Sequence, residues 1–443
     1  MATKNDLLDA LTRTLVARPA DLRSSLGISQ PRFSRLVAEA GEELVCRMGR
    51  GRATRYARTR SVRGLGHEVP LFRVSEAGAA APCGTLHLLR GGQHWLEQAE
   101  GGRLFAGLPP ALSDMAPQGY LGRGFSGHFP ELDLPPNLSD WSDDHRLIAL
   151  ARRGEGCVGD LILGDESLGR FIAWSPLEVA RDEYPRRAEQ SAREPAGSSA
   201  GGERPKFGAF SRGRHVLVKF TLGEGSPAER RWRDLLWCEW KALETVAAAG
   251  VPAARAEWLD VGGARFREVD RFDRIGARGR RAVLTLGALD DEYFGGRDNW
   301  TAAAGRLSGT RPFLLSVTGA RQLRWLDTFG QLIGNTDRHA GNVAFLVGPG
   351  EAVRLAPAYD MVPMILAPSG DTLAARAFQP EAPTGKTLDV WPDAAAWAGR
   401  YWHDVAANDS LEPGLRAFAR GALDAVAALA TRVTPSPEAN VGE

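Results

Sequence analysis

The chain has 443 residues, 43% of them apolar and 25% charged, which suits two or three globular domains and excludes the collagen-like and wholly disordered classes. It lacks a signal peptide and a membrane-spanning apolar run, and its four scattered cysteines lack zinc-finger or disulfide spacing, so we expect a soluble cytoplasmic protein without a membrane partner. The net charge is only +1, but residues 1–60 carry twelve Lys and Arg against six Asp and Glu, a local charge of +6.

The beginning of the chain predicts a group of short helices. Leucines at helical spacing predict a helix over residues 6–16, and residues 19–26 fit a second one. After Gly27 a third helix is expected, with Ser29 as its N-cap and Pro31 in its first turn. Two short helices joined through a glycine turn indicate a helix-turn-helix, whose second helix enters the major groove of DNA.

A basic hairpin is expected after these helices. Strands fit residues 44–48 and 54–57, and seven arginines but no acidic residue occur from Arg47 to Arg63. Such clustering is costly unless an anionic partner neutralises it, so we assign residues 1–62 to a winged helix-turn-helix that binds DNA. The residues predicted to contact DNA are Gln30, Arg32, Ser34, Arg35, Arg50, Arg52 and Arg55. The alternative is a small helical domain with a solvated charged face, and binding to DNA would also admit a homodimer.

The next region gives weaker signals. From about residue 64 to residue 185, short apolar runs alternate with Gly and Pro, which predicts a mixed α+β region. Residues 181–197 are charged and lack an apolar period, so we expect a linker or surface loop there. The C-terminal residues 433–443 should form a flexible tail.

A Gly/Ser-rich loop, a strand and a helix then follow one another. The loop over residues 197–206 can present backbone N–H groups to phosphate, because glycine permits close approach, although a flexible linker would have the same composition. Lys219 ends the alternating strand over residues 215–220, as the ATP-contacting lysine does in protein kinases. The helix expected over residues 227–250 carries Glu239, a candidate partner for this lysine.

The clearest chemical signal is a set of acids and an amide. Asp337 and Asn342 follow the amphipathic helix expected over residues 320–333 and lie five positions apart. That is the spacing of the catalytic Asp and the metal-binding Asn in the protein-kinase catalytic loop. Asp360, after an expected hairpin, has the position of a further Mg²⁺ ligand. Each acid alone could be a turn residue or an N-cap, but the ordered set predicts phosphoryl transfer from ATP.

Several motifs occur in a characteristic order along the chain, and the last of them is Tyr359-Asp360. The others are Ser199-x-x-Gly202-x-x-x-Lys206, Lys219 in Val-Lys-Phe, Arg271-Phe272-Asp273-Arg274 and Asn335-x-Asp337-x-His339-x-x-Asn342. Together they resemble the HipA family of serine/threonine kinase toxins over about residues 70–430. Within that family the chain looks most similar to YjjJ-like members, which join an N-terminal helix-turn-helix to the kinase-like body.

The resemblance implies an ATP- and Mg²⁺-dependent protein kinase, whose known relatives phosphorylate aminoacyl-tRNA synthetases, arrest growth and silence themselves by autophosphorylation. The resemblance implies that Asp337 is the catalytic carboxylate and that Asn342 and Asp360 bind Mg²⁺. The catalytic set implied is Asp337, Lys219, Asn342, Asp360 and His339. The implied nucleotide-binding residues are Ser199, Gly201, Gly202, Lys206, Lys219, Asp270 and Phe272. Ser199, or its neighbour Ser198, is the implied autophosphorylation site.

The expected fold is α+β, with the winged helix-turn-helix followed by a two-lobed HipA-type, protein-kinase-like body. An α+β subdomain with the Gly-rich loop and the ATP lysine is expected over residues 63–275, and a mostly helical catalytic lobe over residues 276–432. We expect ATP, a protein substrate and DNA as partners, with autoregulation through the DNA-binding domain.

Two other functions remain open. A Mg²⁺-dependent deoxyribonuclease toxin would use Asp337, His339 and Asp360 as metal ligands and base. A transcription factor would carry the kinase-like body in an inactive form. Lys219 and the Gly-rich loop favour the kinase, because a nuclease has no need of them.

Overall fold

The computed structural model describes residues 2–193, 205–223, 225–296, 298–309, 314–348, 353–373 and 376–433. The chain forms two compact units. The first comprises Met1–Gln118 and His128–Trp174, and the second comprises Gly119–Gly127 and Ser175–Glu443. None of the described helices is long and apolar enough to cross a membrane.

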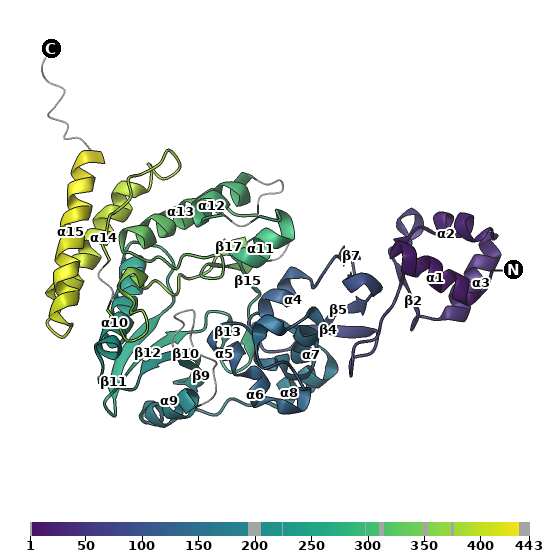
Figure 1. The fold of residues 1–443 in the computed structure, drawn as a ribbon, viewed down its shortest axis with the longest axis horizontal. Coiled ribbons are helices and arrows are strands. Elements are labelled where there is room, and N and C mark those ends of the chain that lie inside the picture. Colours follow the sequence, from purple (N-terminus) through teal and green to yellow (C-terminus); the bar gives the residue numbers. More distant parts are fainter. Residues whose placement is uncertain are drawn as a thin grey trace, which may run out of the picture. The chain divides into compact units, whose positions relative to one another are not determined.

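The N-terminal part of the first unit combines helices with a small antiparallel sheet in the order β1-β3-β2 (Figure 1). Its elements are α1 (Lys4–Thr14), β1 (Val16–Ala17), α2 (Pro19–Leu26), α3 (Gln30–Ala40), β2 (Val45–Met48) and β3 (Arg55–Arg58). Gly27, with φ +63°, ends α2 in the left-handed conformation that glycine adopts without strain. The predicted helices and both predicted strands are therefore confirmed, and β1 is an addition.

A mixed region completes the first unit, as the sequence predicts. Its antiparallel sheet has the order β7-β6-β5-β4-β8. The elements are β4 (Glu68–Val74), β5 (Ala80–Leu88), β6 (His94–Gln98), β7 (Gly101–Phe105), α4 (Pro110–Met115), α7 (Asp143–Arg153), β8 (Leu161–Leu163) and α8 (Asp165–Ala173). Arg60, just after β3, donates to Leu89 O at 3.0 Å and to Asp144 Oδ2 at 2.9 Å, which ties the N-terminal part to this sheet. The short helices α5 (Gly119–Arg123) and α6 (Phe125–His128) lie where the two units alternate along the chain.

The second unit begins with a four-stranded antiparallel sheet in the order β11-β12-β10-β9. Its elements are α9 (Tyr184–Arg193), β9 (Lys206–Ser211), β10 (Arg214–Thr221), α10 (Pro227–Ala248), β11 (Ala256–Val261) and β12 (Ala264–Asp270). The expectation of a loop over residues 181–197 is wrong for its described part, because α9 occupies residues 184–193. Tyr184 and Ala188, one turn apart, are fully buried against β10 and β12, and this short apolar stripe holds an otherwise charged helix.

The rest of the second unit is mostly helical. Its elements are β13 (Arg274–Ile275), β14 (Gly279–Arg280), β15 (Val283–Thr285), α11 (Leu286–Tyr293), α12 (Trp300–Gly309), α13 (Val317–Leu332), β16 (Ala344–Val347), β17 (Val353–Leu355), α14 (Trp391–Ala407) and α15 (Pro413–Val433). A continuous apolar core runs from α10 through α13 to α14 and α15 and contains the buried Trp300, Trp325, Trp391 and Trp402. The predicted boundaries at residues 62/63 and 275/276 fall inside the two units, and we keep them as proposed subdivisions.

Candidate active site

A buried lysine links two carboxylates in the second unit. Lys219 Nζ lies 2.8 Å from Glu239 Oε1 and 2.7 Å from Asp360 Oδ1. Lys219 is 7% exposed and Glu239 is 1% exposed, so these charges are largely shielded from water. The structure thus brings the lysine of β10, the glutamate of α10 and the aspartate after β17 to one place.

Strand alternation explains why Lys219 reaches this position. Val216, Val218 and Phe220 point to one face of the sheet and pack with Tyr184 of α9. Successive side chains of a strand point to opposite faces, so Lys219 points to the other face, toward α10. Helix α10 begins with a capping box at Ser226 and carries Glu239 on its buried side.

The charges of this cluster support one another. Burial alone would lower the pKa of Lys219, but the carboxylates of Asp360 and Glu239 outweigh it and raise that pKa. Burial would raise the pKa of Asp360, but the ammonium groups of Lys219 and Lys206 outweigh it and hold that pKa well below its usual value. Both partners are therefore charged at neutral pH. Asp360 also has φ +52°, a left-handed conformation that is uncommon outside glycine, asparagine and aspartate.

The predicted catalytic loop places Asp337 beside Asn342. Asn342 Nδ2 donates to Asp337 O at 2.8 Å and is 3.4 Å from Asp337 Oδ2. Both side chains remain accessible to solvent, as residues that meet a substrate must be. The five-residue spacing thus closes a compact loop that presents a carboxylate and an amide together.

A buried amide connects this loop to Asp360. Asn335 is fully buried, its Oδ1 accepts from Asp337 N at 3.0 Å, and its Nδ2 lies 3.4 Å from Asp360 O. Tyr359 adds a second link, because its hydroxyl donates to Gly341 O at 2.7 Å. The backbones that carry Asp337 and Asp360 are therefore held to one another by side chains from both segments.

An ion pair anchors the same loop to the helical core. Arg338 Nε donates to Asp327 Oδ1 of α13 at 3.0 Å, and Arg338 also bonds Asn335 O. Asp327 Oδ2 in turn accepts from the backbone and hydroxyl of Thr301 on α12. His339, in contrast, is 60% exposed, and its Nε2 is 3.9 Å from Asp337 Oδ1. The structure thus leaves His339 at the edge of the loop, outside the Lys219 cluster.

Two of the predicted nucleotide-binding residues, Asp270 and Phe272, are placed differently from each other. Phe272 packs against Tyr359 with a centroid distance of 5.7 Å, and Tyr359 is the residue that precedes Asp360 in the chain. Asp270 is three positions after Arg267 on β12, and Arg267 is the register partner of Lys219. The side chain of Asp270 therefore points to the face of the sheet opposite to that of Lys219. There it pairs with Arg214. The structure does not bring the Asp270 carboxylate together with the Lys219 cluster.

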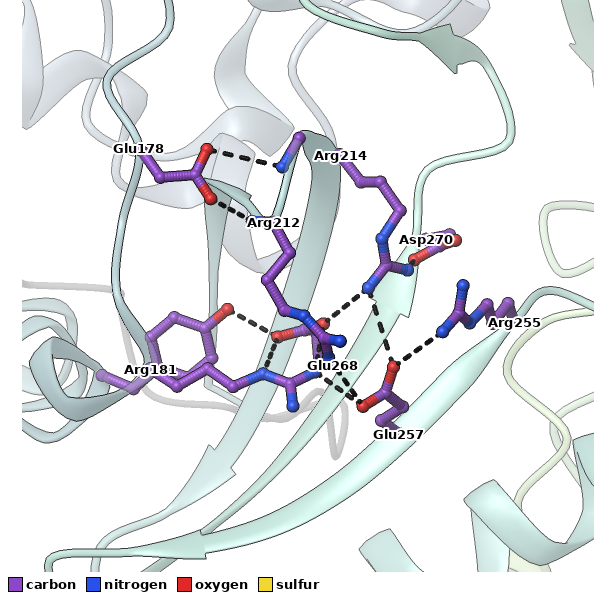
Figure 2. A network of polar contacts seen from close by, with 10 residues as sticks. Glu178, Arg181, Arg212, Arg214, Arg255, Glu257, Glu268 and Asp270 are labelled. Carbon is purple, nitrogen blue, oxygen red and sulfur yellow. Dashed lines mark hydrogen bonds and ion pairs between the residues drawn. The ribbon is translucent and has the colours of Figure 1, made fainter.

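Asp270 belongs to a network of arginines and acids on that outer face (Figure 2). Its centre is the buried Glu268, which accepts from Arg181 Nη2 at 2.8 Å and from the Tyr184 hydroxyl at 2.7 Å. The further members drawn with them are Glu178, Arg212, Arg214, Arg255 and Glu257. The network ties the start of α9 to β12, and α9 leads into the predicted Gly-rich loop.

Most of that loop lies outside the described residues. Ser198, Ser199, Gly201 and Gly202 are in this part, so their predicted roles stay predictions. Lys206 is described as the first residue of β9, where it pairs in register with Lys219 of β10. In that register the Lys206 side chain points to the same face of the sheet as Lys219.

A pocket of about 720 Å³ opens beside the predicted catalytic loop. Its lining includes Asp337, His339, Phe378 and Glu381. Its remaining lining residues include Gln331, Gly334, Asn335, Arg338, Ile365 and Gln379. Among the described residues, no group of three or more His, Cys, Asp or Glu side chains could by itself hold a metal ion.

The residues predicted to contact DNA lie in the N-terminal part of the first unit. Gln30, Ser34 and Arg35 are exposed on α3. Arg50 and Arg52 are exposed in the turn between β2 and β3. Arg32 differs, because it donates to Ala2 O at 2.9 Å and pairs with Glu39 at 3.6 Å. Arg55 is half-buried and donates to Thr54 O at 3.0 Å.

Sequence reasoning left two site residues without a role. Asn335 was noticed as part of a motif, but its buried bridge between Asp337 and Asp360 requires the folded chain. Arg267 contacts Glu239 Oε1 at 2.7 Å and is fully buried. Strand β12 reads Ala-Arg-Phe-Arg-Glu-Val-Asp, so no local pattern distinguishes Arg267 from the other charged residues of the strand.

Comparisons with known proteins agree with this architecture. Residues 65–172 match the family described as YjjJ-like toxin, middle domain, and residues 198–430 match the HipA-like C-terminal domain. Toxin YjjJ of Escherichia coli K12 is 33% identical over 431 residues, which cover 94% of this chain and 96% of that protein. A chain of the Shewanella oneidensis MR-1 complex of HipA, HipB and operator DNA superposes with a TM-score of 0.58 at 15% identity, covering 82% of this chain and 97% of that chain.

Proposed function

Because this chain belongs to the YjjJ-like toxins with a HipA-like C-terminal domain, we propose that it is an ATP- and Mg²⁺-dependent serine/threonine protein kinase. The observation that carries the proposal is the contact of Lys219 Nζ with Glu239 and Asp360, at 2.8 and 2.7 Å. A strand lysine paired with a helix glutamate and facing a metal-binding aspartate is the arrangement on which protein kinases depend.

The residues present suit a magnesium ion. Mg²⁺ prefers hard oxygen ligands, and Asn342 and Asp360 offer an amide and a carboxylate oxygen. The loop that carries Asn342 is tied to the segment of Asp360 through Asn335 and Tyr359. When bound, the ion would neutralise charge on the ATP phosphates.

The remaining steps use the chain's own groups. Lys219 would bind the α- and β-phosphates, while Asp337 orients the hydroxyl of the acceptor and accepts its proton. The hydroxyl oxygen then bonds the γ-phosphorus, the bond from that phosphorus to the bridging oxygen breaks, and ADP leaves. Positioning and charge neutralisation supply most of the rate enhancement in such reactions.

The acceptor is proposed to be a protein. Asp337 lines the pocket of about 720 Å³, which has room for side chains next to the acceptor hydroxyl. Ser199 in the Gly-rich loop is a second proposed acceptor. A phosphate there would bring about 1.5 to 2 negative charges into a loop that is meant to hold ATP phosphates, and repulsion would inhibit the enzyme.

The deoxyribonuclease alternative gains no support from these contacts. A nuclease has no need of Lys219, which pairs with both Glu239 and Asp360. An inactive kinase-like body would also have no use for the Lys219 and Glu239 pair.

We also propose that residues 1–62 form a winged helix that binds DNA, singly or as a homodimer, and thereby regulates the toxin. The exposed Arg35, Arg50 and Arg52 support this proposal, since they are free to meet phosphates. Arg32 is a weaker candidate, because the structure already pairs it with Glu39.

The experiment that tests the kinase is phosphopeptide mapping. Purified protein is incubated with Mg²⁺ and ATP, and the peptide of residues 197–206 is analysed by mass spectrometry beside an Asp337→Asn control. A phosphate on Ser199 or Ser198 that is absent from the control supports the proposal. An unmodified protein together with Mg²⁺-dependent cleavage of DNA would contradict the kinase and support the nuclease.

A further inference from the structure

A buried arginine shares the carboxylate of Glu239 with Lys219. Arg267 of β12 is the register partner of Lys219 of β10, so both side chains lie on the face of the sheet that meets α10. Arg267 Nη1 is 2.7 Å and Lys219 Nζ is 2.8 Å from the same atom, Glu239 Oε1. Arg267 is fully buried, and Glu239 is nearly so, with 1% of its surface exposed.

Stability alone gives a poor reason for a charge at this position. Within the described parts of the chain, no guanidinium nitrogen of Arg267 forms a hydrogen bond of good geometry. A buried ion pair recovers its desolvation penalty only with good geometry and further hydrogen bonds, and apolar side chains of similar volume often stabilise a fold as well or better. The charge of Arg267 therefore points to a role in the neighbouring site.

The charge balance of the cluster shows what that role is. Lys219 and Arg267 face Glu239 and Asp360, so two cations meet two carboxylates. Under the proposed function, Asp360 would hold Mg²⁺ and Lys219 would bind the phosphates of ATP. Lys219 would then neutralise Glu239 less completely. A buried carboxylate without a neighbouring cation raises the free energy of the folded state. Arg267, which lies too deep to meet a substrate, keeps its charge on Glu239.

We propose that Arg267 is a positioning residue for phosphoryl transfer, which holds Glu239 ionised and directed toward Lys219 and so leaves Lys219 able to bind ATP phosphates. This inference rests on the proposed function. It implies that α10 is fixed in its active position before the nucleotide arrives, because the ion pair between Arg267 and Glu239 does not depend on ATP.

Nucleotide affinity tests the inference without requiring turnover. Binding of β,γ-imidoadenosine triphosphate with Mg²⁺ is measured by calorimetry for the wild type, Arg267→Met and Arg267→Lys, and again for Arg267→Met in a Glu239→Gln background. We expect Arg267→Met to weaken binding by about tenfold or more, and Arg267→Lys to restore most of the loss. In the Glu239→Gln background the same Met substitution should change affinity by less than about twofold, because no buried carboxylate then needs a cation.

Each other outcome counts against the inference. Wild-type affinity in Arg267→Met, or an equal loss on both backgrounds, would show that Arg267 acts through packing alone. If Arg267→Met does not fold, the double variant carries the test, since it leaves no unpaired buried charge, and weaker binding than Glu239→Gln alone overturns the proposal. A wild-type protein that binds no analogue refutes the proposed function itself, and this inference with it.

Discussion

Asp337 owes its position to hydrogen bonds on both of its sides. Asn335 Oδ1 accepts from its backbone N–H, and Asn342 Nδ2 donates to its backbone carbonyl. Neither bond requires the carboxylate of Asp337, whose role is then free to be chemical. A substitution of this carboxylate should spare the fold and change the reaction.

We predict that Asp337→Asn lowers the rate of phosphate transfer by about 10²- to 10⁴-fold, the usual contribution of a positioned acid or base. The backbone bonds of the loop remain, so the melting temperature should stay close to that of the wild type. Asp389→Asn is a matched control, because Asp389 is an exposed aspartate that pairs with Arg324. A variant Asp337→Asn that keeps the wild-type rate would remove Asp337 from the catalytic role.

At single residues the sequence predicted pairings better than orientations. The Lys219 and Glu239 pair was expected from strand alternation and helix placement, and it is present. The direction of the Asp270 side chain could not be predicted. It points to Arg214 because of the register in which β9, β10 and β12 pair, and that register is known only from the folded chain. Arg267 was missed for the same reason.

At the scale of elements, a glycine turn joins α13 to the predicted catalytic loop. Gly334 has φ +71°, and an added Cβ would lie 2.6 Å from Ile365 Cγ2. Ile365 N also donates to Gly334 O at 3.0 Å, so the two segments are in close contact. Gly370, with φ +58°, has open space around the corresponding position.

Gly334→Ala should therefore lower the free energy of unfolding by about 2–4 kcal/mol, from left-handed backbone strain plus the clash with Ile365. Gly370→Ala carries the strain alone and should cost about 1 kcal/mol. Urea denaturation of both variants measures the difference. Equal losses would mean that contact with Ile365 does not constrain the turn.

Helix α10 is joined to the segment before α15 by a buried acid. Asp234 Oδ2 accepts from Glu412 N at 2.8 Å, and Asp234 is 4% exposed. Burial, assisted by the charge of Glu412, raises the pKa of Asp234 from 3.8 to about 6, against the opposing effects of Arg265 and Arg231. The native state thus holds the Asp234 proton more tightly than the unfolded chain does.

The stability contribution of Asp234 is therefore present at low pH and lost as the pH rises through about 6. Asp234→Asn keeps a neutral acceptor for Glu412 N at every pH. We predict that this variant equals the wild type near pH 4 and exceeds its free energy of unfolding above pH 7, by on the order of 1–3 kcal/mol. Denaturation curves across this range test it, and a difference that does not change with pH would contradict it.

Helices were predictable where they carry a full apolar stripe or clear caps. Helix α3 begins after Ser29 and α10 begins with Pro227, as the sequence indicated. Helix α9 was not predicted, because Tyr184 and Ala188 are an isolated buried pair among charged residues. Its stability comes from contact with β10 and β12, which no local pattern announces.

At the scale of the whole molecule, charge is distributed unevenly. Residues 1–60 carry +6 and the remainder −5. Among the described residues, the exposed Arg50 and Arg52 in the turn between β2 and β3 form no ion pair with an acidic side chain. Many arginines of the second unit are paired, as in the network around Glu268 (Figure 2). Binding of a polyanion is thus expected of the first unit.

We predict that the double variant Arg50→Ala and Arg52→Ala binds a short DNA duplex more weakly and reduces the slope of log affinity against log salt by about two. Phosphate transfer should be unchanged. A control with two exposed arginines of the second unit, Arg186→Ala and Arg420→Ala, should bind DNA as the wild type does. Fluorescence anisotropy at several salt concentrations measures the affinity and the slope for each variant. If the Arg50 and Arg52 variant has the slope of the wild type, these two arginines do not contact DNA.

The most direct measurement for the whole account compares two labels on one nucleotide. Purified protein is incubated with Mg²⁺ and ATP labelled in the γ-phosphate or, in parallel, in the α-phosphate. Phosphoryl transfer by Asp337 predicts protein-bound label from the γ position alone, and its loss in Asp337→Asn. Label retained from the α position would mean that a nucleotidyl group is transferred, and absence of both labels would contradict the kinase.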